Sequence, residues 1–277
     1  MPDLARDALV GVVGHVEWVT HALGRVPAPG AIADLSEPFD EPAGGGAVAA
    51  AAIARVGGQA LLFTAIGADL AAARGARVLA DRGVEIVAAT RPAPQTRVLS
   101  ITDPGGERTI MVVGTRLQPT AADDLPWSRM PGLRAAYYAG EDPGALVHAR
   151  AARCLVLTGQ RLSDAIAAGV RPDVVVASGA DPDEDPWGLP GALAPEAIVL
   201  TDGPRGGTVH RPGTSVLRFA AVPPPGPIVD SYGCGDSFAG VLALALARGH
   251  ALAEAVPLAA TAAAACVTWR GGLGPGP

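Results

Sequence analysis

The order of apolar segments in the first third of the chain restricts the fold more than any other feature of the sequence. Short apolar runs alternate with small-residue segments that stop at glycine, the usual residue just after a helix. The pattern predicts strands over 8–13, 60–66 and 85–89 and helices over 47–56 and 70–82. This alternation is typical of a largely parallel sheet with helices on its faces.

Further apolar runs continue the pattern through the rest of the chain. They predict strands over 135–138, 154–158, 174–177, 197–201 and 208–211. A length of 277 residues suits one α/β domain, so we expect residues 1–277 to form a single domain. The glycine- and proline-rich segment 271–277 is expected to be a loose tail.

Two segments interrupt the alternation and predict a smaller second sheet. Residues 17–42 are rich in proline and polar residues with short alternating pieces. Residues 96–113 predict a hairpin, because possible strands over 97–102 and 108–113 flank the turn 103–106, which contains proline and glycine. We expect 17–42 and 96–113 to contribute strands that project from the core as a lid.

Charge and cysteine content exclude several kinds of partner. The formal charge of −6 argues against a nucleic acid or an anionic membrane as partner, because both attract basic proteins. The three cysteines, Cys154, Cys234 and Cys266, form no C-x-x-C pair and predict neither a disulfide framework nor a zinc site. The N-terminal segment lacks the features of a signal peptide, so we expect a cytoplasmic protein without a membrane span.

The chain contains no lysine, and all 21 of its basic residues are arginine. A Walker A loop, a pyridoxal phosphate enzyme and a Schiff-base aldolase each need a lysine. These three classes are therefore excluded.

The segment 230–240, DSYGCGDSFAG, carries the strongest chemical signal. No helix breaker follows over 241–248, so the turn Gly233-Cys234-Gly235 lies where a helix begins. Free N–H groups and the positive end of the helix dipole make such a turn an anion site. Asp236 falls in the first helical turn, where its carboxylate could accept a proton from an attacking hydroxyl. The alternative is that Asp236 only caps the helix.

A second glycine segment, Gly44-Gly45-Gly46, precedes the small-residue helix over 47–56. Three glycines allow a polyhydroxy ligand to approach the backbone closely. The alternative is a flexible turn.

Together the two segments resemble the paired signatures of the ribokinase-like (PfkB-type) carbohydrate kinase family. The segment 44–69 is similar to the N-terminal signature and 230–249 to the C-terminal one. Similarity extends to 14–18, 103–109 and 201–207. The resemblance implies a ribokinase-like three-layer α/β/α fold with a mainly parallel central sheet and a small β lid.

The resemblance also implies roles for individual residues. Asp236 would be the general base, and the amides of Gly233, Cys234 and Gly235 would form an anion hole for the transferred phosphoryl group. Residues that would hold the acceptor are Glu17, Gly44, Gly45 and Gly46. Residues that would lie near the ATP phosphates and base are Thr201, Gly203 and Gly206. The arginines that could neutralise the phosphates are Arg97, Arg108 and Arg161. Tyr137 is interpreted as a packing residue.

Three departures from the family pattern affect the substrate and metal sites. Glu17 stands where relatives commonly have aspartate, and Gly46 stands where ribokinase has lysine. The Asn-x-x-Glu motif that orders Mg²⁺ cannot exist, because the chain contains no asparagine. Asp181 and Glu184 are the nearest carboxylates that could hold magnesium through water. The alternative is an acidic loop without a function.

These features predict an ATP-dependent kinase that phosphorylates a hydroxyl, in particular a hydroxymethyl, of a small sugar or sugar-like acceptor. A nucleoside kinase of the same fold and a catalytically idle binding protein remain alternatives. A Rossmann dehydrogenase is disfavoured, because residues 11–14 do not form G-x-G-x-x-G. A homodimer through the lid is also possible, since an exposed sheet edge favours pairing.

Overall fold

The computed structural model describes residues 9–105 and 108–275, and its largest element is a mixed sheet of nine strands. The sheet consists of β1 (Leu9–Gly14), β4 (Gln59–Ile66), β5 (Val84–Thr90), β8 (Ala135–Ala139), β9 (Leu155–Thr158), β10 (Val174–Ser178), β11 (Ala197–Thr201), β12 (Gly207–His210) and β13 (Leu217–Phe219). Their order is β13-β12-β11-β10-β9-β8-β1-β4-β5. The seven strands from β11 to β5 are parallel, and β12 and β13 are antiparallel. The predicted mainly parallel sheet is thus confirmed, although residue 8 of the first predicted strand lies outside the described residues.

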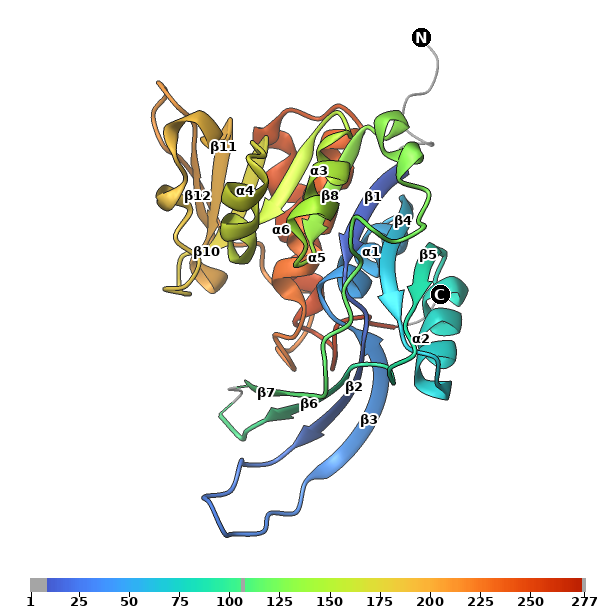
Figure 1. Ribbon diagram of the computed structural model, residues 1–277. Helices are drawn as coiled ribbons and strands as arrows, with labels where there is room; N and C mark the ends of the chain where they lie inside the picture. The colour runs from blue at the N-terminus through green and yellow to red at the C-terminus, as the bar shows by residue number, and fades with distance from the viewer. Residues whose placement is uncertain (1–8, 106–107, 276–277) are drawn as a thin grey trace.

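Helices cover both faces of this sheet (Figure 1). They are α1 (Gly45–Arg55), α2 (Leu70–Asp81), α3 (Pro143–Arg150), α4 (Leu162–Ala168), α5 (Cys234–Ala247) and α6 (Leu252–Cys266). One buried cluster joins α1, α5 and α6 to one face, and a second joins α3 and α4 to the other. Tyr137 and Tyr138, neighbours on β8, belong to opposite clusters, as the two-residue period of a strand requires. This three-layer arrangement confirms the predicted fold class.

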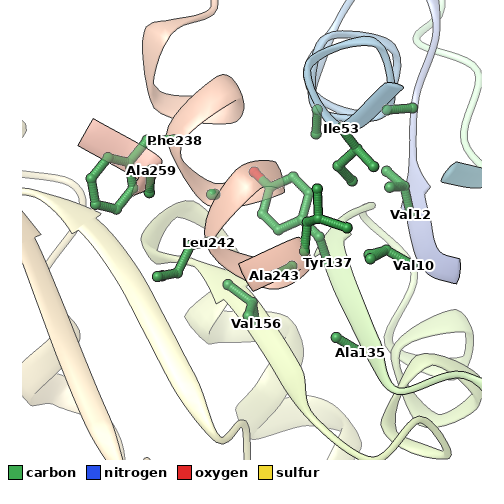
Figure 2. Close-up of a cluster of buried hydrophobic side chains, with 14 of the residues drawn as sticks. Val10, Val12, Ile53, Ala135, Tyr137, Val156, Phe238, Leu242, Ala243 and Ala259 are labelled. Atoms are coloured by element: carbon green, nitrogen blue, oxygen red, sulfur yellow. The ribbon is translucent and has the colours of Figure 1, made fainter. Parts of the chain in front are cut away.

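Small residues form much of the core under α1 and α5. Figure 2 shows this cluster, in which Ile53, Tyr137 and Phe238 are among the larger side chains. Ala135, Ala243 and Ala259 are among its small members. At Gly240 of α5, a Cβ atom would lie 2.8 Å from the carbonyl oxygen of Ala49 on α1. The two helices can approach this closely only because α5 carries no side chain at that point.

A second sheet of four strands projects from the core (Figure 1). It consists of β2 (Glu17–Leu23), β3 (Ser36–Ala43), β6 (Arg97–Thr102) and β7 (Arg108–Val113), in the order β3-β2-β6-β7, and we call it the lid sheet. The strands β6 and β7 have the bounds that the hairpin pattern predicted. The turn predicted over 103–106 extends to residue 106, which lies outside the described residues.

The expectation of a loose C-terminal tail is wrong for its first residues. The Leu273 side chain is 1% exposed, and its carbonyl oxygen accepts a hydrogen bond of 3.0 Å from Arg55. The Gly271 amide donates to Asp230 at 3.0 Å and the Gly272 amide donates to Glu41 at 2.6 Å. These contacts join the tail to α1, to the segment before α5 and to the lid sheet. Residues 276–277 lie outside the described part of the chain.

Within the described part of the chain, no helix is both long and apolar enough to cross a membrane.

The contact between α1 and α5 predicts an unusual response to a glycine substitution. Gly→Ala inside a helix normally stabilises it by up to about 1 kcal/mol. Gly240→Ala should instead lower the free energy of unfolding by about 1–3 kcal/mol, because the new methyl group overlaps Ala49. Urea denaturation measures the change. The control is Gly132→Ala, where a Cβ meets nothing within 4 Å and we expect a change within about 0.5 kcal/mol. A Gly240→Ala protein at least as stable as the wild type would contradict this packing.

Candidate active site

A cavity of about 380 Å³ opens at the carboxyl ends of the parallel strands, where ligands bind in open α/β sheets. Ala139, Thr158, Ser178 and Thr201 line it from the last residues of β8, β9, β10 and β11. The start of α5 lies on another side, and Arg108 and Ile110 reach the cavity from the lid sheet. One space therefore joins the core, the glycine motifs and the lid.

The predicted anion turn lies at this cavity, and Gly233, Cys234, Gly235 and Asp236 all line it. Gly233 has φ 74°, and a Cβ there would lie 2.7 Å from the Val48 side chain. Glycine thus permits both the left-handed conformation and the close contact with α1. The helix begins at Cys234, so its first N–H groups have no partners within the helix.

The carboxylate of Asp236 is held by Tyr137 and lies close to Gly45. Its Oδ1 accepts a hydrogen bond of 2.9 Å from the hydroxyl of Tyr137. Gly45 lies against the same oxygen, since a Cβ at that position would come within 3.1 Å of it. Burial raises the pKa of Asp236 above its ordinary value, and the hydrogen bond from Tyr137 opposes this rise. Asp236 is therefore a more basic carboxylate than a solvated one.

Tyr137 is more than the packing residue that the sequence suggested. Its side chain is 1% exposed within the core of the sheet, while its hydroxyl reaches the cavity. Burial and the nearby Asp236 charge raise the pKa of Tyr137 well above its ordinary value, so the hydroxyl keeps its proton and donates. In the sequence, the position of this tyrosine two residues before the end of an alanine-rich strand was the signal that could have indicated a site residue.

The predicted acceptor-binding residues Glu17, Gly44 and Gly45 meet on another side of the cavity. Glu17 is 4% exposed at the start of β2. Gly44 has φ 91°, and a Cβ there would lie 2.6 Å from the ring of His15. The Gly45 amide donates to His15 Nε2 at 3.3 Å, and Gln118 Nε2 lies 3.3 Å from His15 Nδ1. Burial lowers the pKa of His15, so the ring is neutral at pH 7.

Gly46 differs from the prediction, because it does not line the cavity. A Cβ there would lie 2.7 Å from the backbone of Gly14, at the end of β1. Gly46 therefore allows α1 to start directly against β1.

A chain of ion pairs that the sequence did not suggest holds Glu17. Arg116 Nε lies 2.9 Å from Glu17 Oε1, and the same guanidinium lies 3.2 Å from Glu141. Arg161 lies 2.7 Å from Glu141. Burial alone would raise the pKa of Glu141, but the two arginines together lower it below its ordinary value. Arg116 follows the lid hairpin, so these ion pairs connect the lid to the ends of β8 and β9.

The residues predicted to bind nucleotide and metal divide into two groups. Thr201 and Glu184 line the cavity. Glu184 Oε2 accepts a hydrogen bond of 2.8 Å from the Ser178 amide, and burial raises the pKa of Glu184. Asp181, Gly203 and Gly206 do not line it. Asp181 accepts from the Asp183 amide within its own loop, and the two glycines, with φ 49° and 84°, shape the turn after β11.

Two of the three arginines proposed as phosphate partners reach the cavity. Arg161 lines it and is paired with Glu141. Arg108 lines it from the lid, donates to Ser231 Oγ at 3.2 Å and lies over the Tyr232 ring at 5.3 Å. Arg97, on β6, does not line the cavity. Arg108 is therefore the arginine beside the anion turn.

Solved structures share this fold across nearly the whole chain. Ribokinase from Arabidopsis thaliana, solved with ribose and ATP, is 18% identical, with 98% of this chain and 96% of that chain covered and a TM-score of 0.78. Adenosine kinase from Sinorhizobium meliloti is 16% identical, with 97% and 96% covered and a TM-score of 0.73. At these identities the likeness shows the fold alone, and it confirms the ribokinase-like architecture.

Sequence comparison adds two findings. A stretch of 42 residues is 55% identical to acarbose 7(IV)-phosphotransferase from Actinoplanes sp., and the match spans 15% of this chain and 14% of that protein. A model described as pfkB family carbohydrate kinase matches residues 10–149 and 190–276. Since this match covers most of the chain, the protein belongs to the pfkB family of carbohydrate kinases, as the paired glycine motifs predicted.

Proposed function

We propose that this protein transfers the γ-phosphoryl group of ATP to a hydroxyl of a small sugar or sugar-like acceptor. A hydroxymethyl group is the proposed site of transfer. The observation that carries the proposal is the position of Asp236, whose basic carboxylate lies at a helix N-terminus in the cavity that Glu17 and Thr201 also line. A base, an anion site and a polyol-binding carboxylate together are what phosphoryl transfer to an alcohol requires.

Asp236 is the proposed general base. Tyr137 donates a hydrogen bond to its Oδ1, and no described residue donates one to Oδ2. Asp236 Oδ2 can accept the proton of the acceptor hydroxyl while the oxygen of that hydroxyl attacks the γ-phosphorus. The fixed carboxylate would also orient the hydroxyl, which lowers the entropy cost of reaching the transition state.

The amides of Gly233, Cys234 and Gly235 are proposed to stabilise the charge on the transferred phosphoryl group. They lie at the positive end of α5 and are fixed before the substrate binds. Donors fixed in advance do not have to reorganise during the reaction, which is the main contribution of such sites. Arg108 lies close enough to this turn to add a positive charge from the lid.

ATP and Mg²⁺ are the proposed cofactors, and the cavity has a donor set that fits both. The likeness to a ribokinase solved with ATP supports nucleotide binding beside Thr201. Among the described residues no group of three or more His, Cys, Asp or Glu side chains could hold a metal. Magnesium suits such a site, because it commonly uses one or two carboxylates with phosphates and water. Glu184 would supply that carboxylate, and the ion would neutralise phosphate charge.

The acceptor is proposed to be a sugar held by Glu17 and the backbone at Gly44 and Gly45. The relatives act on or bind different molecules by name, namely ribose, adenosine and acarbose. ATP consumption across a panel of pentoses, hexoses, nucleosides and acarbose tests the acceptor class. Turnover of nucleosides alone would replace the sugar kinase with a nucleoside kinase, and no turnover at all would favour an idle binding protein.

We also propose that the chain acts as a single kinase domain that pairs with a second copy through the lid sheet. β7 is an edge strand of this sheet, and Ile110, Val112 and Val113 on it are 45%, 39% and 60% exposed. Exposed apolar edge strands favour pairing with another strand. Light scattering should give twice the chain mass of 27.7 kDa.

The role of Asp236 predicts a selective loss of turnover. Asp236→Asn should reduce kcat by roughly 10²- to 10⁴-fold, the usual contribution of a positioned base, while ATP binding changes little. Coupled kinase assays and calorimetry with ATP measure the two effects. Asp81→Asn, on the exposed end of α2, is the matched control and should keep full activity. A near-normal kcat in Asp236→Asn would remove Asp236 from the mechanism.

Tyr137 predicts a change in pH dependence. Its hydrogen bond lowers the pKa of Asp236, so Tyr137→Phe should raise that pKa further. Because the base acts only when deprotonated, the acidic limb of kcat/KM should move to higher pH, and activity at neutral pH should fall about 10-fold. Tyr138→Phe is the matched control, since its hydroxyl bonds to the Asp142 carbonyl at 2.7 Å on the opposite face. Equal pH profiles for Tyr137→Phe and the wild type would contradict this role.

A further inference from the structure

Two cysteines that lie 32 positions apart in sequence meet beneath the proposed anion turn. Cys234 is the first residue of α5, and Cys266 is the last residue of α6. The two helices are joined by a short loop and pack against each other, with α6 running back along α5 (Figure 1). They have 14 and 15 residues, so at 1.5 Å per residue the end of α6 lies level with the start of α5.

The two side chains differ in environment but touch each other. Cys234 is half-buried and lines the cavity, whereas Cys266 is completely buried. The thiols of Cys234 and Cys266 lie close enough for each to shift the pKa of the other. Cys266 Sγ lies 3.3 Å from the carbonyl oxygen of Tyr232, the residue just before the anion turn. A cysteine pair thus lies directly behind the amides that would bind the phosphoryl group.

We propose that Cys234 and Cys266 form an oxidation site, at which hydrogen peroxide converts the two thiols to a disulfide that displaces the anion turn. The cavity is the path by which a small oxidant reaches Cys234.

The environment of the pair supports thiolate chemistry. The contact with Cys234 lowers the pKa of Cys266, and Ser237 and Arg55 add to this effect against the opposing effect of burial. The same contact raises the pKa of Cys234. The contact therefore favours the thiolate at Cys266, and the Cys234 thiol at the cavity can pass its proton to that sulfur as it reacts with an oxidant. Cys154 has no such partner, and burial raises its pKa to about 12.

The reaction balances with peroxide as the only co-reactant. The Cys234 sulfur attacks one peroxide oxygen and the O–O bond breaks. The departing hydroxide takes up the proton that the Cys234 thiol releases, so one water leaves as Cys234 becomes a sulfenic acid. The Cys266 thiol then attacks that sulfur, the S–S bond forms, and the hydroxyl leaves with the thiol proton as a second water. The two cysteines are oxidised by two electrons and the peroxide is reduced by two.

Disulfide formation should deform the anion turn rather than α6. The sulfur atoms must move from non-bonded contact to a separation of about 2.05 Å. Cys266 is fixed within the core, whereas Cys234 is flanked by Gly233 and Gly235. The movement therefore falls on the amides of the turn. A displacement of about 1 Å at such a site can reduce turnover up to about 10²-fold.

The test treats the full-length protein with hydrogen peroxide and follows both the thiols and the activity. The chain has three cysteines, so the free thiols should fall from three to one, and peptide mapping should find Cys234 joined to Cys266. Kinase activity should fall at least about 10-fold and return with dithiothreitol. ATP should slow the oxidation, because it occupies the cavity that Cys234 lines. The effect on activity rests on the proposed function, whereas mapping reads the disulfide even if the protein is not a kinase.

Two variants serve as matched arms of the experiment. Cys154→Ser removes the cysteine at the opposite end of the sheet and should leave basal activity, disulfide formation and the loss on oxidation unchanged. Cys266→Ala removes the partner and should abolish disulfide formation and the reversible loss, with each protein compared to its own reduced form. The wild-type mapping stands by itself if Cys266→Ala does not fold. Three free thiols after treatment, a loss that dithiothreitol does not reverse, or a disulfide without a loss of activity would each overturn the proposal.

Discussion

The close approach of the starts of α1 and α5 is the constraint on which the rest of the structure depends. Both helices must begin at the carboxyl ends of the central strands, and each does so through a residue without a side chain. Gly46 allows α1 to meet the backbone at the end of β1, and Gly45 then lies against the carboxylate of Asp236. Gly240, one helical turn after Asp236, allows α5 to pack closely against α1. The glycines and alanines of this region therefore position the residues that line the cavity more than they provide flexibility.

The lid is connected to this core by ion pairs at the cavity as well as by a buried apolar cluster, in which Val19 and Val98 of the lid belong with Val48 of α1. Arg116, just after the lid hairpin, bridges Glu17 and Glu141, and Arg161 extends the bridge to the end of β9. Glu17 is one methylene longer than the aspartate that relatives commonly have, and in this structure it reaches an arginine. An acceptor that binds Glu17 must therefore share this carboxylate with Arg116. If the proposed acceptor binds Glu17, one side chain would couple acceptor binding to lid position, which would be a physical route to closing the lid only over a bound substrate.

The periodicity of apolar residues and the positions of glycine predicted the parallel sheet, the lid hairpin and the two helix starts at the glycine motifs. Each of these features depends on residues that are near one another in sequence. The helices α3, α4 and α6 were not predicted, since α6 is almost uniformly apolar and small and gives no 3.6-residue signal. Tyr137, Arg116 and Glu141 were missed because their partners lie 99 residues away for Tyr137 and 99 and 25 residues away for Arg116. The family match omits residues 150–189, where Arg161, Ser178 and Glu184 lie, so the metal side had the weakest sequence signal.

Burial explains how these scattered groups act together. Inside the cavity the ring of His15 is neutral, Tyr137 keeps its proton, and the pKa values of Asp236 and Glu184 are raised, all because burial disfavours charge. Arg116 and Arg161 pair with the neighbouring carboxylates of Glu17 and Glu141. A site arranged in this way carries little unbalanced charge before the substrates arrive. If ATP binds as proposed, its phosphates would be the largest new charges in a region of low dielectric constant, where the fixed dipoles at the start of α5 act most strongly.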